Sequence, residues 1–172
     1  MKQPFRVAIL GSASSGKTTL AAALAEKYGA LWVPEYLREF VDVRQRVPVA
    51  ADQIHIARTQ VAREDAAAAQ GGRFLFCDTT PLMTSVYSRH YFGGIDAELE
   101  ALTASHGYDV TLVCAPDIPW VPDGLQRENQ DLSGVINGYL NEELARRAIP
   151  HTRIHGPLAE RLQQVAQLLG QV

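Results

Sequence analysis

The sequence predicts an α/β protein with a doubly wound parallel sheet. Short, mostly apolar runs at 6–10, 73–78 and 109–115 have the length and composition of buried strands. Helix-forming runs separate them, and strands that alternate with helices are typical of a parallel sheet covered on both faces. A glycine-containing loop at 11–18 joins the first strand to the first helix, and such strand ends are where open α/β sheets bind ligands.

Composition limits the kind of protein that this chain can be. Its 172 residues suit one domain, 1–172, with room for a small lid, and 47% hydrophobic residues are typical of a soluble globular protein. The formal net charge of -3 argues against a nucleic-acid partner, which would need a basic surface. We expect no signal peptide and no membrane helix, which needs roughly 18 apolar residues in a run. Cytoplasm is therefore the expected compartment, and a homo-oligomer stays open.

The two cysteines, Cys77 and Cys114, each lie in a strand-like run. We expect both to be small buried apolar side chains and not a disulfide, because the expected compartment is reducing. The five histidines show no zinc-binding spacing with cysteine partners, so we expect no structural metal.

Residues 11–18, Gly-Ser-Ala-Ser-Ser-Gly-Lys-Thr, fit the phosphate-binding pattern G-x-x-x-x-G-K-[ST] at every fixed position. The glycines allow a tight turn, so that backbone N–H groups and the N-terminus of the next helix can face a phosphate. The lysine can reach the β- and γ-phosphates, and the threonine hydroxyl is placed for Mg²⁺. A chance match is the alternative, but the flanking strand and helix argue against it. The predicted ATP ligands are Gly11, Ser14, Ser15, Gly16, Lys17, Thr18 and Thr19.

The other elements follow from hydrophobic periodicity and turn residues. Leu20, Leu24 and Tyr28 recur every four residues and mark the buried face of the first helix, which Gly29 ends. Strands are expected at 6–10, 30–33, 73–78, 109–115 and 151–154. Later helices are expected at 53–70, 81–91, 96–105, 132–147 and 158–169.

The longest expected helix, 53–70, begins after Asp52, which is a good N-cap residue. Ile54, Ala57 and Val61 give it only a moderate apolar stripe. Its alanine-rich end favours helix strongly, and two glycines at 71–72 end it.

A charged stretch, Glu-Tyr-Leu-Arg-Glu-Phe-Val at 35–41, follows the strand that Pro34 stops. The carboxyl ends of parallel strands form the ligand-binding edge of an open sheet. If the chain is helical from Tyr36, the side chains of Glu35, Arg38 and Glu39 share one face. The alternative is a solvated helix start with ordinary surface charges.

The run Arg73–Asp78 resembles a Walker B strand, in which an acidic residue follows four apolar ones. A carboxylate at this strand end would lie beside the phosphate loop and meet the metal directly or through water. The alternative is that Asp78 caps the helix that begins at Pro81. Thr79 and Thr80 can also cap that helix, so both roles can coexist at neighbouring residues.

Prolines recur every third residue at the start of the stretch 116–129, which opposes both helix and sheet. We expect a lid-like loop at about 116–131. Trp120 can stack on a flat aromatic ligand there, and Arg127 can reach a transferring phosphoryl group. The alternatives are a tryptophan that pins the loop and a solvated arginine.

Four stretches together resemble one family. They are 11–20, 35–41, 76–79 and Pro-Trp-Val-Pro-Asp-Gly-Leu at 119–125, in the order found in ribosylnicotinamide kinases of the NadR type. The phosphate loop is generic, whereas the second and fourth stretches are much more specific. The resemblance covers nearly the whole chain and implies a P-loop kinase that phosphorylates nicotinamide riboside with ATP and Mg²⁺.

The resemblance also implies roles for single residues. Glu35 would lie nearer the substrate hydroxyl as its base and Asp78 nearer the metal with Thr18, although the reverse assignment stays open. Trp120 would stack on the pyridinium ring, and Asp123 would face that cation or bind ribose hydroxyls. The remaining implied residues are Tyr36 and Arg38 on the substrate side and Arg127 over the phosphates.

NadR-type proteins also carry an adenylyltransferase domain, and some add a DNA-binding domain. We expect neither in this chain, so the resemblance implies kinase activity alone, on nicotinamide riboside or another small molecule. A nucleotide-dependent ATPase switch is the rival interpretation. Such a switch has no reason to keep an aromatic and acidic pocket opposite the phosphate loop.

Overall fold

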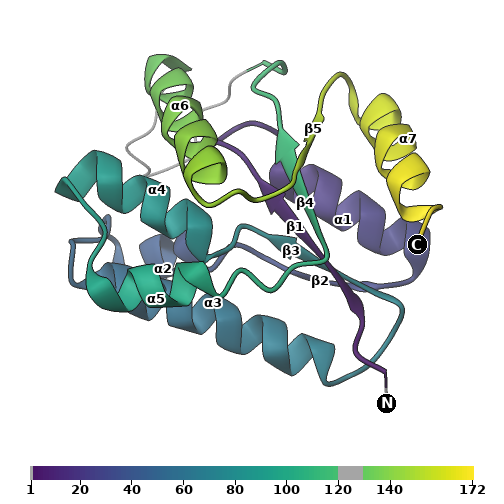
Figure 1. Cartoon of the computed structure of the whole chain (residues 1–172), viewed down its shortest axis with the longest axis horizontal. Coiled ribbons are helices and arrows are strands. Elements are labelled where there is room, and N and C mark those ends of the chain that lie inside the picture. The colour runs from purple at the N-terminus through teal and green to yellow at the C-terminus, as the bar shows by residue number, and fades with distance from the viewer. Residues whose placement is uncertain (1, 120–129) are drawn as a thin grey trace.

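A computed structural model of the chain describes residues 2–119 and 130–172. Its strands form one parallel five-stranded sheet in the order β2-β3-β1-β4-β5 (Figure 1). The strands are β1 (Phe5–Leu10), β2 (Leu31–Val33), β3 (Phe74–Asp78), β4 (Val110–Cys114) and β5 (Thr152–Ile154). The first strand pairs with β3 on one side and with β4 on the other, which puts the phosphate-binding pattern at the centre of the sheet.

Helices cover both faces of this sheet, so the predicted doubly wound fold is confirmed. They are α1 (Lys17–Tyr28), α2 (Tyr36–Arg44), α3 (Asp52–Ala68), α4 (Pro81–Phe92), α5 (Ala97–Ala104), α6 (Gln130–Arg146) and α7 (Leu158–Leu169). Side chains alternate along β1, so that Val7 and Ile9 pack with α1 and α7, while Leu10 packs with α4 and α6. No helix in the described ranges combines the length and the apolar character needed to cross a bilayer.

Most element boundaries match the expectation to within a few residues, and both cysteines are buried as expected. One predicted cap is wrong, and one alternative that the sequence left open is ruled out. Asp52 is the first residue of α3 and not its N-cap, because its carboxylate binds the N–H of Val49 and the Arg46 guanidinium. The N-cap of α4 is Thr80, so the alternative role of Asp78 as that cap does not hold.

The buried face of α3 is also different from the predicted stripe. Much of the buried face consists of the polar residues Gln53, Gln60 and Glu64, whereas Ile54 and Val61 are only half-buried. Glu64 is 1% exposed and accepts a hydrogen bond of 2.5 Å from the hydroxyl of Tyr108. Burial raises the pKa of Glu64 to about 7, and the hydrogen bond from Tyr108 offsets only part of that effect.

Substitution of Glu64 by glutamine tests this protonation state. Between the ordinary pKa of 4.5 and the folded value of about 7, folded Glu64 keeps a proton that the unfolded chain loses. Its contribution to stability is therefore complete at low pH and declines as the pH rises to about 7. As the pH rises across this range, the free energy of unfolding of Glu64→Gln should increase by up to about 3 kcal/mol relative to that of the unsubstituted protein. Denaturant unfolding at several pH values measures this stability difference. A difference that does not change with pH would contradict the raised pKa of Glu64.

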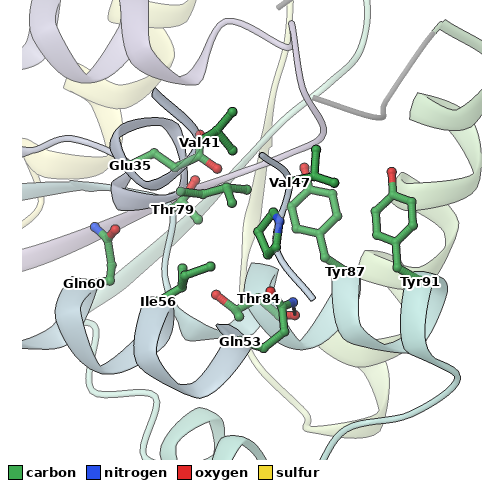
Figure 2. A pocket seen from close by; sticks show the side chains of 12 residues that line it. Glu35, Val41, Val47, Gln53, Ile56, Gln60, Thr79, Thr84, Tyr87 and Tyr91 are labelled. Carbon is green, nitrogen blue, oxygen red and sulfur yellow. Dashed lines mark hydrogen bonds between the residues drawn. The ribbon is translucent and has the colours of Figure 1, made fainter. Parts of the chain in front are cut away.

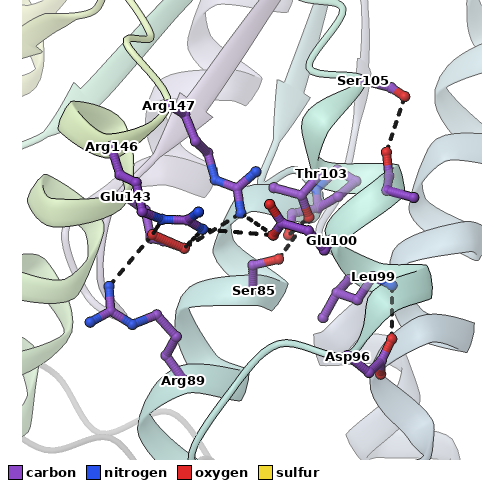
Figure 3. A network of polar contacts seen from close by, with 12 residues as sticks. Ser85, Arg89, Asp96, Leu99, Glu100, Thr103, Ser105, Glu143, Arg146 and Arg147 are labelled. Atoms are coloured by element: carbon purple, nitrogen blue, oxygen red, sulfur yellow. Dashed lines mark hydrogen bonds and ion pairs between the residues drawn. The ribbon is translucent and has the colours of Figure 1, made fainter.

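A network of charges fixes α6 against α4 and α5 (Figure 3). The carboxylate of Glu143 is fully buried and accepts hydrogen bonds from Arg146 at 2.8 and 2.9 Å, with Arg147 and Arg89 within 3.5 Å. The hydrogen bonds from Arg146, and then the charges of Arg147 and Arg89, hold the pKa of Glu143 below its usual range. Glu100 of α5 binds Arg147 at 2.5 Å. This network orients α6, whose other end reaches the phosphate-binding pattern.

Candidate active site

The residues that match the phosphate-binding pattern form a tight loop between β1 and α1. Gly11 has a φ of 146°, and a Cβ there would lie 2.6 Å from the Ser15 hydroxyl and 3.0 Å from the Cys114 carbonyl. Gly16 is the N-cap of α1 with a φ of 89°. The Ser15 hydroxyl donates to the carbonyl of Ser12 at 2.7 Å. Positive φ and close packing therefore restrict both glycine positions.

Lys17 begins α1 and is only 7% exposed. Its ammonium donates to the carbonyl of Ser12 at 2.9 Å, so the charge lies against the loop and not in open solvent. Ser14 is half-buried with a φ of 58°, and Thr19 is exposed. The loop thus gathers backbone donors, a helix N-terminus and one cation, which is the chemistry that binds polyphosphate.

Two oxygen groups meet where α1 begins beside the end of β3. The Thr18 hydroxyl donates to the fully buried carboxylate of Asp78 at 2.7 Å. The other carboxylate oxygen of Asp78 is buried without a hydrogen-bond partner among the described residues. Hydroxyl and carboxylate oxygens are the ligands that Mg²⁺ prefers, so this pair fits that ion.

A buried arginine of α7, which the sequence analysis did not single out, holds the loop through hydrogen bonds to backbone carbonyls. Arg161 is 2% exposed and donates to the carbonyls of Ser15 at 2.6 Å, Ala115 at 3.0 Å and Gly156 at 2.7 Å. It also binds the carboxylate of Asp117 at 2.6 Å. Although burial opposes it, hydrogen bonds from Gly156 and Arg161 lower the pKa of Asp117. Arg161 therefore ties the segment after β4 and the turn before α7 to the phosphate loop.

Helix α6 holds the loop from the other side. The hydroxyl of Ser133 donates to the Ser12 hydroxyl oxygen at 2.6 Å, and the amide of Asn137 donates to the same oxygen at 2.8 Å. All three side chains are buried. The charged network around Glu143 orients α6. The contacts of Ser133 and Asn137 therefore couple that network to the conformation of the loop.

A pocket opens between α2, α3 and α4 (Figure 2). The pocket volume, including the part that is open to solvent, is about 690 Å³, and most of the wall is apolar or aromatic. The side chains that line it are Glu35, Leu37, Val41, Val47, Pro48, Gln53, Ile56, Gln60, Thr79, Thr84, Tyr87 and Tyr91. Such a wall with a few polar groups is typical of a small-molecule site.

Glu35 is the predicted site residue that the fold brings into this pocket. It is the N-cap residue of α2 and is 8% exposed. Of the other charges in the same stretch, Arg38 is exposed and Glu39 pairs with Arg63 of α3. Tyr36 is half-buried, and its ring packs edge-on against Phe40 and His55.

Thr79 connects the pocket to the phosphate loop. It follows Asp78 directly and lines the pocket, and its N–H donates to the carbonyl of Ile9 at 3.0 Å. Its φ of 73° is rare for a β-branched residue. Backbone strain of this kind is concentrated at functional sites.

The pocket also contains an aromatic pair that sequence reasoning left without a role. Tyr87 and Tyr91 stack with their ring centres 6.2 Å apart and their planes at 20°. Their spacing of four residues on α4 is visible in the sequence, but the face of α4 that meets the pocket is not. The predicted residues Trp120, Asp123 and Arg127 lie outside the described residues.

The family model of an AAA domain matches residues 6–161. The chain belongs to this family. The AAA-domain chain is also 30% identical over 124 residues to the trifunctional NAD biosynthesis/regulator protein NadR of Salmonella typhimurium strain LT2. It is 31% identical over 124 residues to NadR of Escherichia coli strain K12, so the resemblance to NadR-type proteins is confirmed. Each match covers 70% of this chain, which spans 30% of the length of these curated relatives.

Solved structures agree on the fold of the AAA-domain chain. A crystal structure of NadR in complex with NR superposes with a TM-score of 0.82 at 20% identity and covers 97% of this chain and 52% of that one. Thymidylate kinase from Candida albicans gives a TM-score of 0.70 at 14% identity, with 98% and 92% covered. Deoxyadenosine kinase from M. mycoides gives 0.67 at 12% identity, with 98% and 100% covered.

Proposed function

We propose that this AAA-domain chain transfers the γ-phosphoryl group of ATP to the 5′-hydroxyl of a nucleoside, with nicotinamide riboside as the leading candidate. One observation carries the proposal. Asp78 and Thr79 are consecutive, yet Asp78 binds Thr18 of the phosphate loop while Thr79 lines the pocket that contains Glu35. A nucleotide site and an acidic, aromatic pocket therefore share one wall. The NadR relatives and the nucleoside and nucleotide kinases with this fold support the same reaction class.

In this proposal the phosphate loop and Lys17 hold the β- and γ-phosphates of ATP. Thr18 and Asp78 would hold Mg²⁺, which would supply positive charge to stabilise the transferring phosphoryl group. The buried contacts from Arg161 and Asn137 keep the loop in one conformation. Phosphoryl transfer needs positioning and charge stabilisation more than covalent chemistry, so a preorganised loop supplies most of what the reaction requires.

Glu35 would accept the proton of the attacking hydroxyl, because its carboxylate lines the pocket next to Thr79. The rings of Tyr87 and Tyr91 would hold a flat base. A pyridinium ring suits such a wall by cation–π attraction of about 1–2 kcal/mol. Stacking by Trp120, ribose contacts by Asp123 and phosphate contacts by Arg127 stay predictions, as do substrate contacts by Tyr36 and Arg38.

Three broader statements also belong to this proposal. We assign residues 1–172 to one kinase domain with a lid at about 116–131. We expect it to act in the cytoplasm on a small molecule, without nucleic acid, and a homo-oligomer stays open. ATP and Mg²⁺ are the proposed cofactors.

An ATPase switch is the rival function, and a nucleoside panel separates the two. ADP release is measured with Mg²⁺-ATP alone and after addition of nicotinamide riboside, adenosine, cytidine, uridine or thymidine. A kinase releases ADP at a rate that depends on one or more of these nucleosides. Turnover that no nucleoside changes would support the switch instead.

Tyr87→Ala should raise the KM for the nucleoside by about 10-fold, because it removes a ring from the pocket wall. The KM for ATP should change less than about 2-fold, since Tyr87 lines the pocket proposed for the nucleoside. Tyr139→Ala is the matched control, because Tyr139 packs on Arg89 outside the pocket. Equal changes in both KM values for Tyr87→Ala would remove it from the nucleoside site.

A further inference from the structure

Gln60 of α3 brackets Glu35 through the backbone on both sides of it. The side-chain oxygen of Gln60 accepts from the N–H of Tyr36 at 2.8 Å, and its nitrogen donates to the carbonyl of Pro34 at 3.3 Å. Gln60 is 3% exposed, so water does not compete freely for these bonds. One side-chain amide therefore holds both residues that flank Glu35.

The local backbone cannot supply this restraint itself. β2 is only three residues long and lies at the edge of the sheet. Pro34 has no N–H to donate, and Glu35 makes no side-chain bond to cap α2. The N–H of Tyr36 is one of the groups that a helix N-terminus leaves without an intrahelical partner. Gln60 satisfies that N–H in place of a cap, so the Glu35 carboxylate is not used for it.

We propose that Gln60 is a positioning residue that sets where the Glu35 carboxylate stands in the pocket. This inference rests on the proposed function, in which Glu35 accepts the proton of the nucleoside hydroxyl. The geometry requires one donor and one acceptor on the same side chain, which glutamine supplies. Leucine supplies neither, and glutamate supplies only the acceptor and adds a negative charge beside Glu35.

A double-mutant cycle tests whether Gln60 acts through Glu35. Gln60→Leu should lower kcat about 10- to 100-fold, since a misplacement of about 1 Å can cost that much. The KM for ATP should change less than about 2-fold. In a Glu35→Gln background, where no base remains to be positioned, Gln60→Leu should lower kcat less than about 2-fold further. Losses that multiply in the double variant would overturn the inference.

The variant Gln60→Glu, which adds a negative charge, gives a second readout, the pH dependence of kcat. A purely structural role of Gln60 would leave that pH dependence unchanged. In Gln60→Glu the new carboxylate should raise the pKa of Glu35. When kcat is plotted against pH, the rise on the acidic side (the acidic limb) should therefore shift to higher pH. A lower kcat with an unmoved limb would overturn the inference, even if Gln60→Leu fails to fold. Glu64→Gln, one turn along α3 and outside this pocket, is the control and should keep both kcat and the limb.

Failure of the inference can be told from failure of the proposed function. If Glu35→Gln alone keeps full kcat, Glu35 is not the base and the proposed role of the pocket acid is wrong. If Glu35→Gln is impaired while Gln60→Leu keeps full kcat, the base is correct and Gln60 does not position it. The assays use the full chain with Mg²⁺-ATP and the best nucleoside of the panel.

Discussion

Lys17→Ala should lower nucleoside phosphorylation by at least about 1,000-fold, because the only described ammonium at the phosphate loop is lost. The fold should persist, since the lysine contributes one hydrogen bond to Ser12 while Arg161 and Asn137 continue to hold the loop. Steady-state kinetics measure the loss, and thermal unfolding monitors the fold.

Lys27→Ala is the matched control for this substitution. Lys27 lies on the same helix but is exposed at its far end, so its removal should leave both activity and stability nearly unchanged. Retained activity in a folded Lys17→Ala protein would mean that the loop does not hold the transferred phosphates. A parallel loss in Lys27→Ala would point to a general effect of charge on α1.

Asp78→Asn and Glu35→Gln should each lower kcat by at least about 100-fold, but they should respond differently to Mg²⁺. The Asp78 carboxylate binds the Thr18 hydroxyl, and its second oxygen is buried at the same place. Loss of its charge should therefore raise the Mg²⁺ concentration that gives half-maximal rate. Glu35 lines the nucleoside pocket, so its substitution should lower the rate at every Mg²⁺ concentration.

Thr18→Val checks the assignment from the other side of the hydrogen bond. It removes the hydroxyl that binds Asp78, so it should shift the Mg²⁺ dependence in the same direction as Asp78→Asn. Identical Mg²⁺ curves for the Asp78 and Glu35 variants would end this division of roles. A shift in the Glu35 variant alone would support the reverse assignment, with Glu35 nearer the metal.

The sheet and the phosphate loop could be predicted because their signals are local. The loop pattern and its flanking strand and helix lie within a short stretch of chain, and the order of strands and helices favours a parallel sheet. Asp78 and Glu35 could be singled out because each lies at the carboxyl end of a predicted strand, and parallel strands end at one edge of the sheet. The apolar face of α1 follows from helical spacing in the same way.

The polar support of the site could not be predicted, because its partners are distant in the chain. Arg161 is 146 residues from Ser15, and Gln60 is 24 residues from Tyr36. Hydrophobic periodicity depends on apolar residues, so it misses the buried polar residues Gln53, Gln60 and Glu64 and selects Ile54 and Val61 on α3. The positive φ of Thr79 is likewise a property of the packed strand end and not of its residue type.

The fate of the γ-phosphoryl group tests the account most directly. The protein is incubated with Mg²⁺ and ATP labelled in its γ-phosphate, with nicotinamide riboside and in parallel with each nucleoside of the panel, and the labelled products are separated and identified. We expect the label on the 5′-oxygen of a nucleoside, with little free phosphate released in its absence. Label found only as inorganic phosphate, at a rate that no nucleoside changes, would contradict a kinase that joins the phosphate loop to the aromatic pocket.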